Sequence, residues 1–231
     1  MVSYRTASNR LWPRSLVSDL SNLRILAGKG AVPVVAAPGR TKPELRSALL
    51  SARRATAPEV RQQADLAIRA ALAALIAEVG AETVCAYRPM TGEPGGAQLP
   101  DLPGVRRVLL PVLRPDLDLD WAAYPAPLVA GRYGLSEPDG PRLGLDAIAG
   151  ADLVVAPGLA VSADGVRLGR GGGSYDRALA RVSPSALVVV PLYEGELVDR
   201  LPAEPHDRPV DAVVTPAGVR LVSHTGRNRP R

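Results

Sequence analysis

The segment Val166-Arg-Leu-Gly-Arg-Gly-Gly-Gly-Ser-Tyr-Asp-Arg-Ala-Leu179 places a glycine-rich loop directly before a stretch with the apolar spacing of a helix. Glycine occupies four of the five positions from 169 to 173, so this backbone can adopt positive φ and approach an anion closely. Several N–H groups of such a loop can face one oxyanion, and the dipole of a helix over residues 174–182 favours negative charge at the same place. The segment therefore predicts a phosphate site.

The spacing of the glycines matches neither of the two common phosphate fingerprints. Ser174 stands at the sixth position counted from Gly169, which breaks the G-x-G-x-x-G pattern, and no Lys-Ser/Thr pair follows to complete a Walker loop. A glycine-rich run by itself is equally typical of a mobile surface turn. The flanking Arg167, Arg170 and Asp176 favour the phosphate site over the turn.

The composition is that of a globular protein with an aliphatic core. Of the 231 residues 46% are apolar, enough for one α/β domain or two small ones, but only 3% are aromatic and phenylalanine is absent. Cys85 is the only cysteine, which excludes an intrachain disulfide and a Cys-rich zinc site, and its apolar neighbours predict a small buried side chain. No apolar run reaches about 18 residues. We expect a cytoplasmic protein without a membrane span.

Most of the positive charge lies at the two ends of the sequence. Residues 1–40 carry six Lys or Arg against one Asp, and residues 220–231 carry four Arg and no acid. Because the whole chain has a net charge of +5, residues 41–219 carry −4. This distribution argues against a basic nucleic-acid surface on the fold. We expect a disordered extension over residues 1–40, a folded domain over 41–219 and a basic tail over 220–231.

Two tandem helices are expected at the start of the domain. Thr41-Lys-Pro-Glu44 and Thr56-Ala-Pro-Glu59 both have the pattern of a capping box, and Gly80 is expected to end the second helix. Lys42 and Arg46 are four residues apart, so both cations project from one face of the first helix. That face is either part of a binding site or an ordinary solvated surface.

Short apolar segments separated by Pro/Gly turns predict five strands, at residues 83–87, 105–113, 153–156, 186–190 and 212–215. Their continuous apolar runs are typical of strands buried on both faces, and helical segments are expected between several of them. These features indicate an α/β fold with a largely parallel sheet. Ligands of such sheets bind beyond the carboxyl ends of the strands. Glu93 follows the first predicted strand, the glycine-rich loop follows the strand at 153–156, and Asp207 lies shortly before the last strand. We expect these segments to converge on one site.

From residue 41 to residue 216 the sequence resembles the 5-formyltetrahydrofolate cyclo-ligases, also called methenyltetrahydrofolate synthetases. Five motifs match in order and spacing: Lys42–Arg46, Tyr87–Glu93, Asp152–Gly158, Gly165–Arg177 and His206–Asp211. The resemblance implies a three-layer α/β/α domain with a largely parallel sheet, like that of ribose-5-phosphate isomerase-like and CoA-transferase-like proteins. It also implies an enzyme that uses ATP and Mg²⁺ to convert 5-formyltetrahydrofolate into 5,10-methenyltetrahydrofolate through phosphorylation of the formyl oxygen, releasing ADP and phosphate.

The resemblance assigns roles to particular residues. Those implied to bind ATP are Lys42, Arg46, Arg167, Gly169, Arg170, Gly171, Gly172, Gly173, Ser174 and Tyr175. Those implied to bind the reduced folate are Arg88, Glu93, Ser174 and Tyr175, with Glu93 on the pterin. The implied catalytic residues are Arg170 and Tyr175, and the implied magnesium carboxylates are Asp176 and Asp207.

Ordinary structural roles and other functions fit the same residues. Asp176 suits the first turn of a helix, and Asp207 suits a turn. Two positions depart from the family pattern, because Ser174 replaces an aromatic residue and Pro-Gly-Gly follows Glu93. The alternative functions are a non-catalytic regulator that binds nucleotide or folate, and an isomerase-like enzyme that binds a phosphosugar without magnesium. We expect a monomer without nucleic-acid partners.

Overall fold

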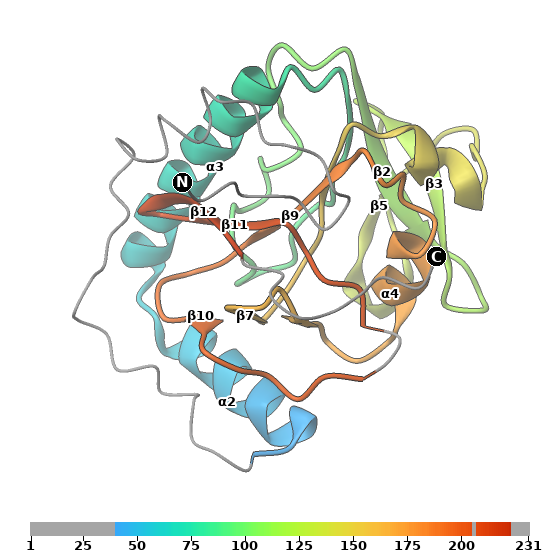
Figure 1. Cartoon of the computed structure of the whole chain (residues 1–231). Coiled ribbons are helices and arrows are strands. Elements are labelled where there is room, and N and C mark those ends of the chain that lie inside the picture. The colour runs from blue at the N-terminus through green and yellow to red at the C-terminus, as the bar shows by residue number, and fades with distance from the viewer. Residues whose placement is uncertain (1–39, 205–206, 223–231) are drawn as a thin grey trace.

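The computed structural model describes residues 40–204 and 207–222, and a seven-stranded sheet forms its centre (Figure 1). The strand order is β12-β11-β9-β6-β1-β2-β3. The five inner strands run parallel, and the edge strands β3 and β12 pair antiparallel with their neighbours. In the same order the strands are Gly218–Leu221, Ala212–Thr215, Leu187–Pro191, Leu153–Val155, Thr83–Cys85, Arg107–Leu113 and Leu119–Tyr124.

All five predicted strands belong to this sheet, and they are its five parallel strands. The two edge strands escaped the prediction because polar residues such as Asp120 and Arg220 interrupt their apolar patterns. Strand β12 reaches Leu221, so the first two residues of the predicted basic tail pair with β11. The predicted N-terminal extension, apart from Arg40, lies outside the described residues.

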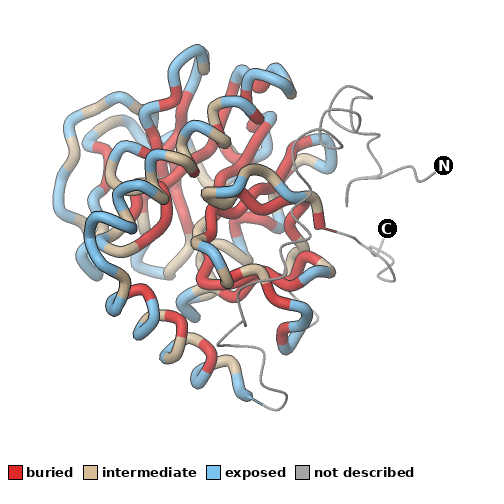
Figure 2. Tube along the Cα trace, turned by 90° about the vertical axis from the view of Figure 1, so that its left-hand side faces the viewer, coloured by how far each residue is buried: buried red, intermediate tan, exposed pale blue. Residues whose placement is uncertain are grey.

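Helix α3 (Pro58–Val79) covers one face of the sheet (Figure 1). Four of its aliphatic side chains are buried against residues from strands β1, β2, β6, β9 and β11: Ile68, Leu72, Leu75 and Ile76. The opposite face is covered by the short helix α4 (Ser174–Leu179) and the 3-10 helix η2 (Leu145–Gly150). The buried segments gather at the centre of the molecule (Figure 2). The separate clusters made by α3 and by α4 with η2 confirm the expected layered arrangement.

The connections between the strands contain fewer helices than predicted. Among the described residues, α4 is the only α-helix that lies between two strands of the central sheet, and it is part of the connection from β6 to β9. The remaining connections are loops, 3-10 turns and short strands, including the hairpin of β4 (Leu128–Ala130) and β5 (Ser136–Pro138) with the 3-10 helix η1 (Arg132–Gly134) between them. Pro/Gly-rich segments therefore replace the crossover helices of a regular α/β sheet.

The ends of the two N-terminal helices fit the prediction in part. At Thr41 the backbone N–H donates to the Glu44 carboxylate at 2.7 Å, so the first capping box is confirmed. The second is wrong, because the Thr56 hydroxyl donates to the Ala52 carbonyl at 3.1 Å and thereby closes the preceding helix. At the far end of α3, Gly80 adopts φ 63° and ends the helix as predicted.

Helix α2 (Lys42–Ala55) packs on a second, small sheet rather than on the central one. This sheet has the order β10-β7-β8, with strands Leu197–Val198, Ala160–Ser162 and Arg167–Leu168. Leu45 and Leu49 of α2 are buried in one cluster with residues of all three strands (Figure 1). Because β8 leads directly into the glycine-rich loop, this packing places α2 beside that loop.

Cys85 lies in the middle of the central sheet and is fully buried, as predicted. Burial raises the pKa of its thiol to about 12, which keeps it protonated and unreactive. None of the helices in the described ranges is long and apolar enough to cross a membrane.

Candidate active site

The glycine-rich loop lies between strand β8 and helix α4, and two of its glycines need their conformational freedom. Gly171 has φ 104° and Gly173 has φ 70°, values that residues with a Cβ rarely adopt. No described residue accepts a hydrogen bond from the backbone N–H groups of residues 169–174. Since α4 has six residues and ends at Leu179, short of the predicted residue 182, its dipole contributes little. The candidate anion site therefore consists of the loop amides and the cations around them.

Two of these cations come from the start of α2. The Arg46 Nε donates to the Gly169 carbonyl at 2.9 Å, and a Cβ on Gly171 would lie 3.3 Å from Arg46 Cζ. One turn earlier, the Lys42 ammonium lies 3.2 Å from the Asp207 carboxylate and 3.4 Å from that of Glu204. Arg46 therefore contacts the loop and Lys42 contacts the segment before β11, so this face of the helix is not simply solvated.

Arg167 is the third cation, and its side chain is only 4% exposed. Its Nη2 donates to the Asp176 carboxylate at 2.5 Å, and its Nη1 donates to the Pro157 carbonyl at 3.0 Å. The guanidinium lies 5.9 Å from the centre of the Tyr175 ring, and its buried Nε has no hydrogen-bond partner among the described residues. An unpaired buried donor is costly, so this nitrogen is available to an incoming acceptor.

Arg170 joins the loop to the segment that follows β1. Its Nε donates to the Glu93 carboxylate at 2.9 Å, although the two residues are 77 positions apart. The other oxygen of this buried carboxylate accepts the backbone N–H of Met90 at 2.8 Å, and the Tyr193 hydroxyl donates to the Glu93 carbonyl at 3.3 Å. The expected convergence of the glycine-rich loop and Glu93 is therefore confirmed.

Other predicted site residues mainly support this arrangement. The Tyr175 ring packs beneath Arg167, and its hydroxyl is buried without a partner among the described residues. Burial raises the pKa of Tyr175, so the hydroxyl stays protonated and can donate a hydrogen bond. Ser174 is the first residue of α4. The Arg88 Nη1 donates to the Ala97 carbonyl at 3.0 Å and so fastens the loop that contains Glu93.

The two proposed magnesium carboxylates each contact a different cation. Asp176 is paired with Arg167, and Asp207 with Lys42. Within the described ranges, no three His, Cys, Asp or Glu residues lie close enough together to hold a metal by themselves. A Mg²⁺ ion held by one or two carboxylates together with phosphate oxygens and waters would not need such a cluster.

Sequence reasoning missed a buried ion pair beside the site. Arg53, near the end of α2, donates to both carboxylate oxygens of Glu196 at 2.7 and 2.8 Å and to the Gly158 carbonyl at 2.8 Å. Its guanidinium also lies 5.6 Å from the centre of the Tyr193 ring. In the sequence, Arg53 and Arg54 look like ordinary cations in the last turn of a helix. The spacing of seven residues from Arg46 was the one available sign that Arg53 shares the face of the site.

The architecture and the site together define a layered α/β protein whose glycine-rich loop contacts a buried carboxylate in the segment after β1. The model of the 5-formyltetrahydrofolate cyclo-ligase family matches residues 38–216, which include every part of this site, and the chain belongs to that family.

Named relatives cover most of the chain. A 5-formyltetrahydrofolate cyclo-ligase from Mycolicibacterium smegmatis is 44% identical over 185 residues, which are 77% of this chain and 94% of that protein. The cyclo-ligase from Escherichia coli K12 is 32% identical over 179 residues, or 72% of this chain and 96% of the relative. The NMR structure of Aquifex aeolicus 5,10-methenyltetrahydrofolate synthetase superposes with a TM-score of 0.67 at 31% identity, covering 82% of this chain and 96% of that one.

Proposed function

We propose that the protein uses ATP to convert 5-formyltetrahydrofolate into 5,10-methenyltetrahydrofolate, with release of ADP and phosphate. Membership of the family supports the reaction class. The observation that carries the proposal for this chain is the contact between Arg170 and Glu93. It joins the loop suited to the phosphates of ATP to the carboxylate suited to the N–H groups of a pterin, so both substrates can meet at one place.

The chemistry requires a poor leaving group to be activated. The formyl oxygen attacks the γ-phosphorus of ATP, the bond from that phosphorus to the bridging oxygen breaks, and ADP leaves. The neighbouring folate nitrogen then attacks the formyl carbon and gives up its proton, and phosphate leaves with the former formyl oxygen. Phosphoryl transfer of this kind depends mainly on positioning and on charge stabilisation.

The residues divide these tasks between them. The loop amides with Lys42, Arg46 and Arg167 hold the phosphates, where guanidinium groups can bind two oxygens at once. Arg170 is 44% exposed and lies between the two halves of the site, so it can turn from Glu93 to the transferring phosphoryl group when the pterin takes its place. Tyr175 takes part through its ring, which lies against the Arg167 guanidinium and supports it.

Asp176 and Asp207 would hold Mg²⁺ together with phosphate oxygens. When bound, the ion neutralises charge on the phosphates during transfer. On the protein side, Arg167 holds the Asp176 carboxylate in place, and Lys42 holds that of Asp207. The ion pair with Arg167 thus fixes Asp176 in the helix that follows the loop, and the pair with Lys42 ties Asp207 to α2 before any substrate arrives.

The direct test mixes the purified protein with Mg-ATP and 5-formyltetrahydrofolate and follows the absorbance of the methenyl product together with ADP release. The proposal expects the two products in equal amounts. If both ligands bind but neither product appears, the protein is the non-catalytic regulator instead. Turnover that persists without magnesium would contradict the assignment of Asp176 and Asp207.

Glu93→Gln is expected to raise the KM for 5-formyltetrahydrofolate by about tenfold, because a buried carboxylate that accepts two charge-assisted hydrogen bonds becomes a neutral amide. The KM for ATP should change much less. Steady-state kinetics with each substrate varied in turn measures the difference. Glu82→Gln serves as the control, since Glu82 forms only an exposed ion pair with Arg106. An unchanged folate KM would remove Glu93 from the pterin site.

Gly171→Ala is expected to raise the KM for ATP by about tenfold, because φ of 104° strains a residue with a Cβ by about 1–3 kcal/mol and the new methyl group would meet Arg46. The loop should relax into a conformation that no longer presents its amides together. Gly140→Ala is the matched control, since its φ is not positive and a Cβ there meets no atom within 4 Å. Equal ATP kinetics in the two variants would contradict the proposed role of the loop.

A further inference from the structure

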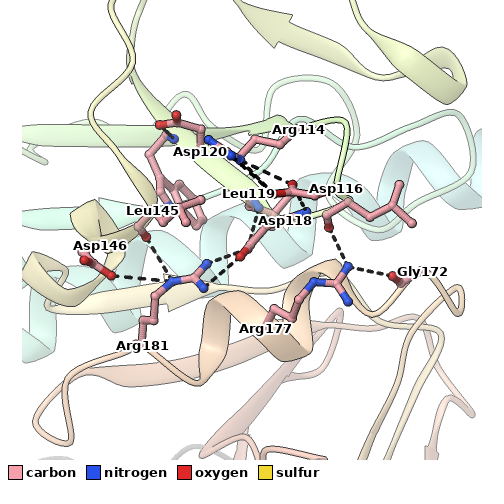
Figure 3. Close-up of polar contacts among 12 residues, drawn as sticks. Arg114, Asp116, Asp118, Leu119, Asp120, Leu145, Asp146, Gly172, Arg177 and Arg181 are labelled. Atoms are coloured by element: carbon pink, nitrogen blue, oxygen red, sulfur yellow. Dashed lines mark hydrogen bonds and ion pairs between the residues drawn. The ribbon is translucent and has the colours of Figure 1, made fainter.

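Arg177 contacts the glycine-rich loop but has no part in the function proposed above. Its Nη2 donates both to the Gly172 carbonyl at 3.1 Å and to the Leu117 carbonyl at 2.7 Å. A Cβ on Gly173 would lie 3.1 Å from Arg177 Nη1, so the guanidinium lies directly against the loop. One side chain thereby ties the loop to the turn between β2 and β3 (Figure 3).

The hydrogen bond to Gly172 fixes the direction of a backbone amide. A trans peptide is planar, so its N–H points away from its C=O. Holding the Gly172 carbonyl toward Arg177 therefore turns the N–H of Gly173 to the opposite side. Arg46 does the same at the other end of the loop, where its bond to the Gly169 carbonyl sets the N–H of Arg170. Two arginines from different helices thus set two peptide planes of the loop.

The turn that holds Arg177 is itself well fixed. Leu117 adopts φ 65°, and the turn is closed by the hydrogen bond from the Leu117 N–H to the Arg114 carbonyl at 3.0 Å. Arg181, one helical turn beyond Arg177, donates two hydrogen bonds to the Asp118 carboxylate at 2.6 and 3.0 Å (Figure 3). Arg177 of α4 and Arg181 in the turn after this helix thus meet adjacent residues, Leu117 and Asp118.

We infer that Arg177 is a positioning residue for nucleotide binding, which orients the loop amides toward the phosphates and is anchored by the turn Arg114–Asp118. This inference rests on the proposed binding of ATP by the loop. A second possibility is that Arg177 binds a phosphate directly. The anchor separates the two, because Asp118 holds the turn and does not contact the loop.

The test measures the affinity for Mg-ATP by calorimetry, without folate, in the full-length protein. Arg177→Gln is expected to weaken binding about tenfold, since a charged donor to two carbonyl oxygens is removed, and Arg177→Lys should recover part of the loss. Asp118→Asn is expected to weaken binding as well, by a smaller factor. In turnover assays the KM for ATP should rise in these variants while the KM for 5-formyltetrahydrofolate stays the same.

Arg142→Gln is the matched control, because the Arg142 Nη1 also bridges two backbone carbonyls, those of Pro138 and Gly140, after β5. Melting curves show whether each variant is folded. The inference is overturned if folded Arg177→Gln binds Mg-ATP within about twofold of the wild type. It is also overturned if Asp118→Asn has no effect, which leaves direct phosphate contact as the role of Arg177. Wild-type protein that binds no Mg-ATP would refute the proposed function and this inference together.

Discussion

Replacing Asp176 by Asn is expected to lower kcat by about a hundredfold or more while the protein stays folded. The amide oxygen of Asn can still accept the hydrogen bond from Arg167, so the local structure is kept. The negative charge that would hold Mg²⁺ beside the phosphates is lost. The variant should therefore bind folate normally and fail in phosphoryl transfer, which single-turnover measurement of ADP release can show.

The control for this experiment is Asp139→Asn, which neutralises an exposed carboxylate after β5. Raising the magnesium concentration should restore part of the activity of Asp176→Asn and leave the control unchanged, because a weakened metal site can still fill at higher concentration. Full turnover at ordinary magnesium concentration would reject Asp176 as a ligand and leave it as a partner of Arg167 only.

Replacing Arg53 by Met is expected to lower the free energy of unfolding by about 3 kcal/mol or more, because it leaves the Glu196 carboxylate buried without its cation. Burial already raises the pKa of Glu196, and hydrogen bonds from Arg53 oppose that rise. Without Arg53 the pKa in the folded state moves further above that of the unfolded chain. The free energy of unfolding of the variant should therefore be highest at acid pH. It should fall as the pH rises from the pKa of Glu196 in the unfolded chain to its higher pKa in the folded protein.

Denaturant unfolding at about pH 5 and pH 8 tests this prediction against wild-type protein. The double variant Arg53→Met with Glu196→Leu should regain much of the lost stability, because it removes the charge that the single variant leaves unpaired. If the single variant loses the same stability at both pH values, the cost comes from lost packing and from the hydrogen bond to Gly158 rather than from the carboxylate.

The five inner strands were predictable because each is a continuous apolar run bounded by turns. Such runs are too short for a helix and are typical of buried strands. The same argument failed at β3, where Asp120 accepts the backbone N–H groups of Trp121 and Gly144 and is buried within an edge strand. At Thr56 the sequence pattern of a capping box was present, but the hydroxyl had a competing acceptor one turn earlier in the preceding helix.

The loop of the candidate site could be predicted from the sequence because four glycines lie within five consecutive positions. Its partners were not, since the contacts of Arg170 with Glu93 and of Arg53 with Glu196 join residues 77 and 143 positions apart. The position of Glu93 after the first predicted strand and the resemblance to a family placed it near the loop beforehand, but neither named Arg170 as its partner. Arg177 lies inside the motif that resembles the family. Its contact with the Leu117 carbonyl could not be predicted, because no sequence pattern pairs these two residues.

Helix α2 supplies Lys42, Arg46 and Arg53 to three separate acceptors: Asp207, the Gly169 carbonyl and Glu196. Leu45 and Leu49 lie on the same face of the helix as these cations and pack it on the small sheet. Because one helix carries all three cations, a change in the packing of its leucines is expected to displace the three side chains together. Substitutions at Leu45 or Leu49 are therefore expected to change the affinity for ATP, although neither side chain makes a polar contact with the loop.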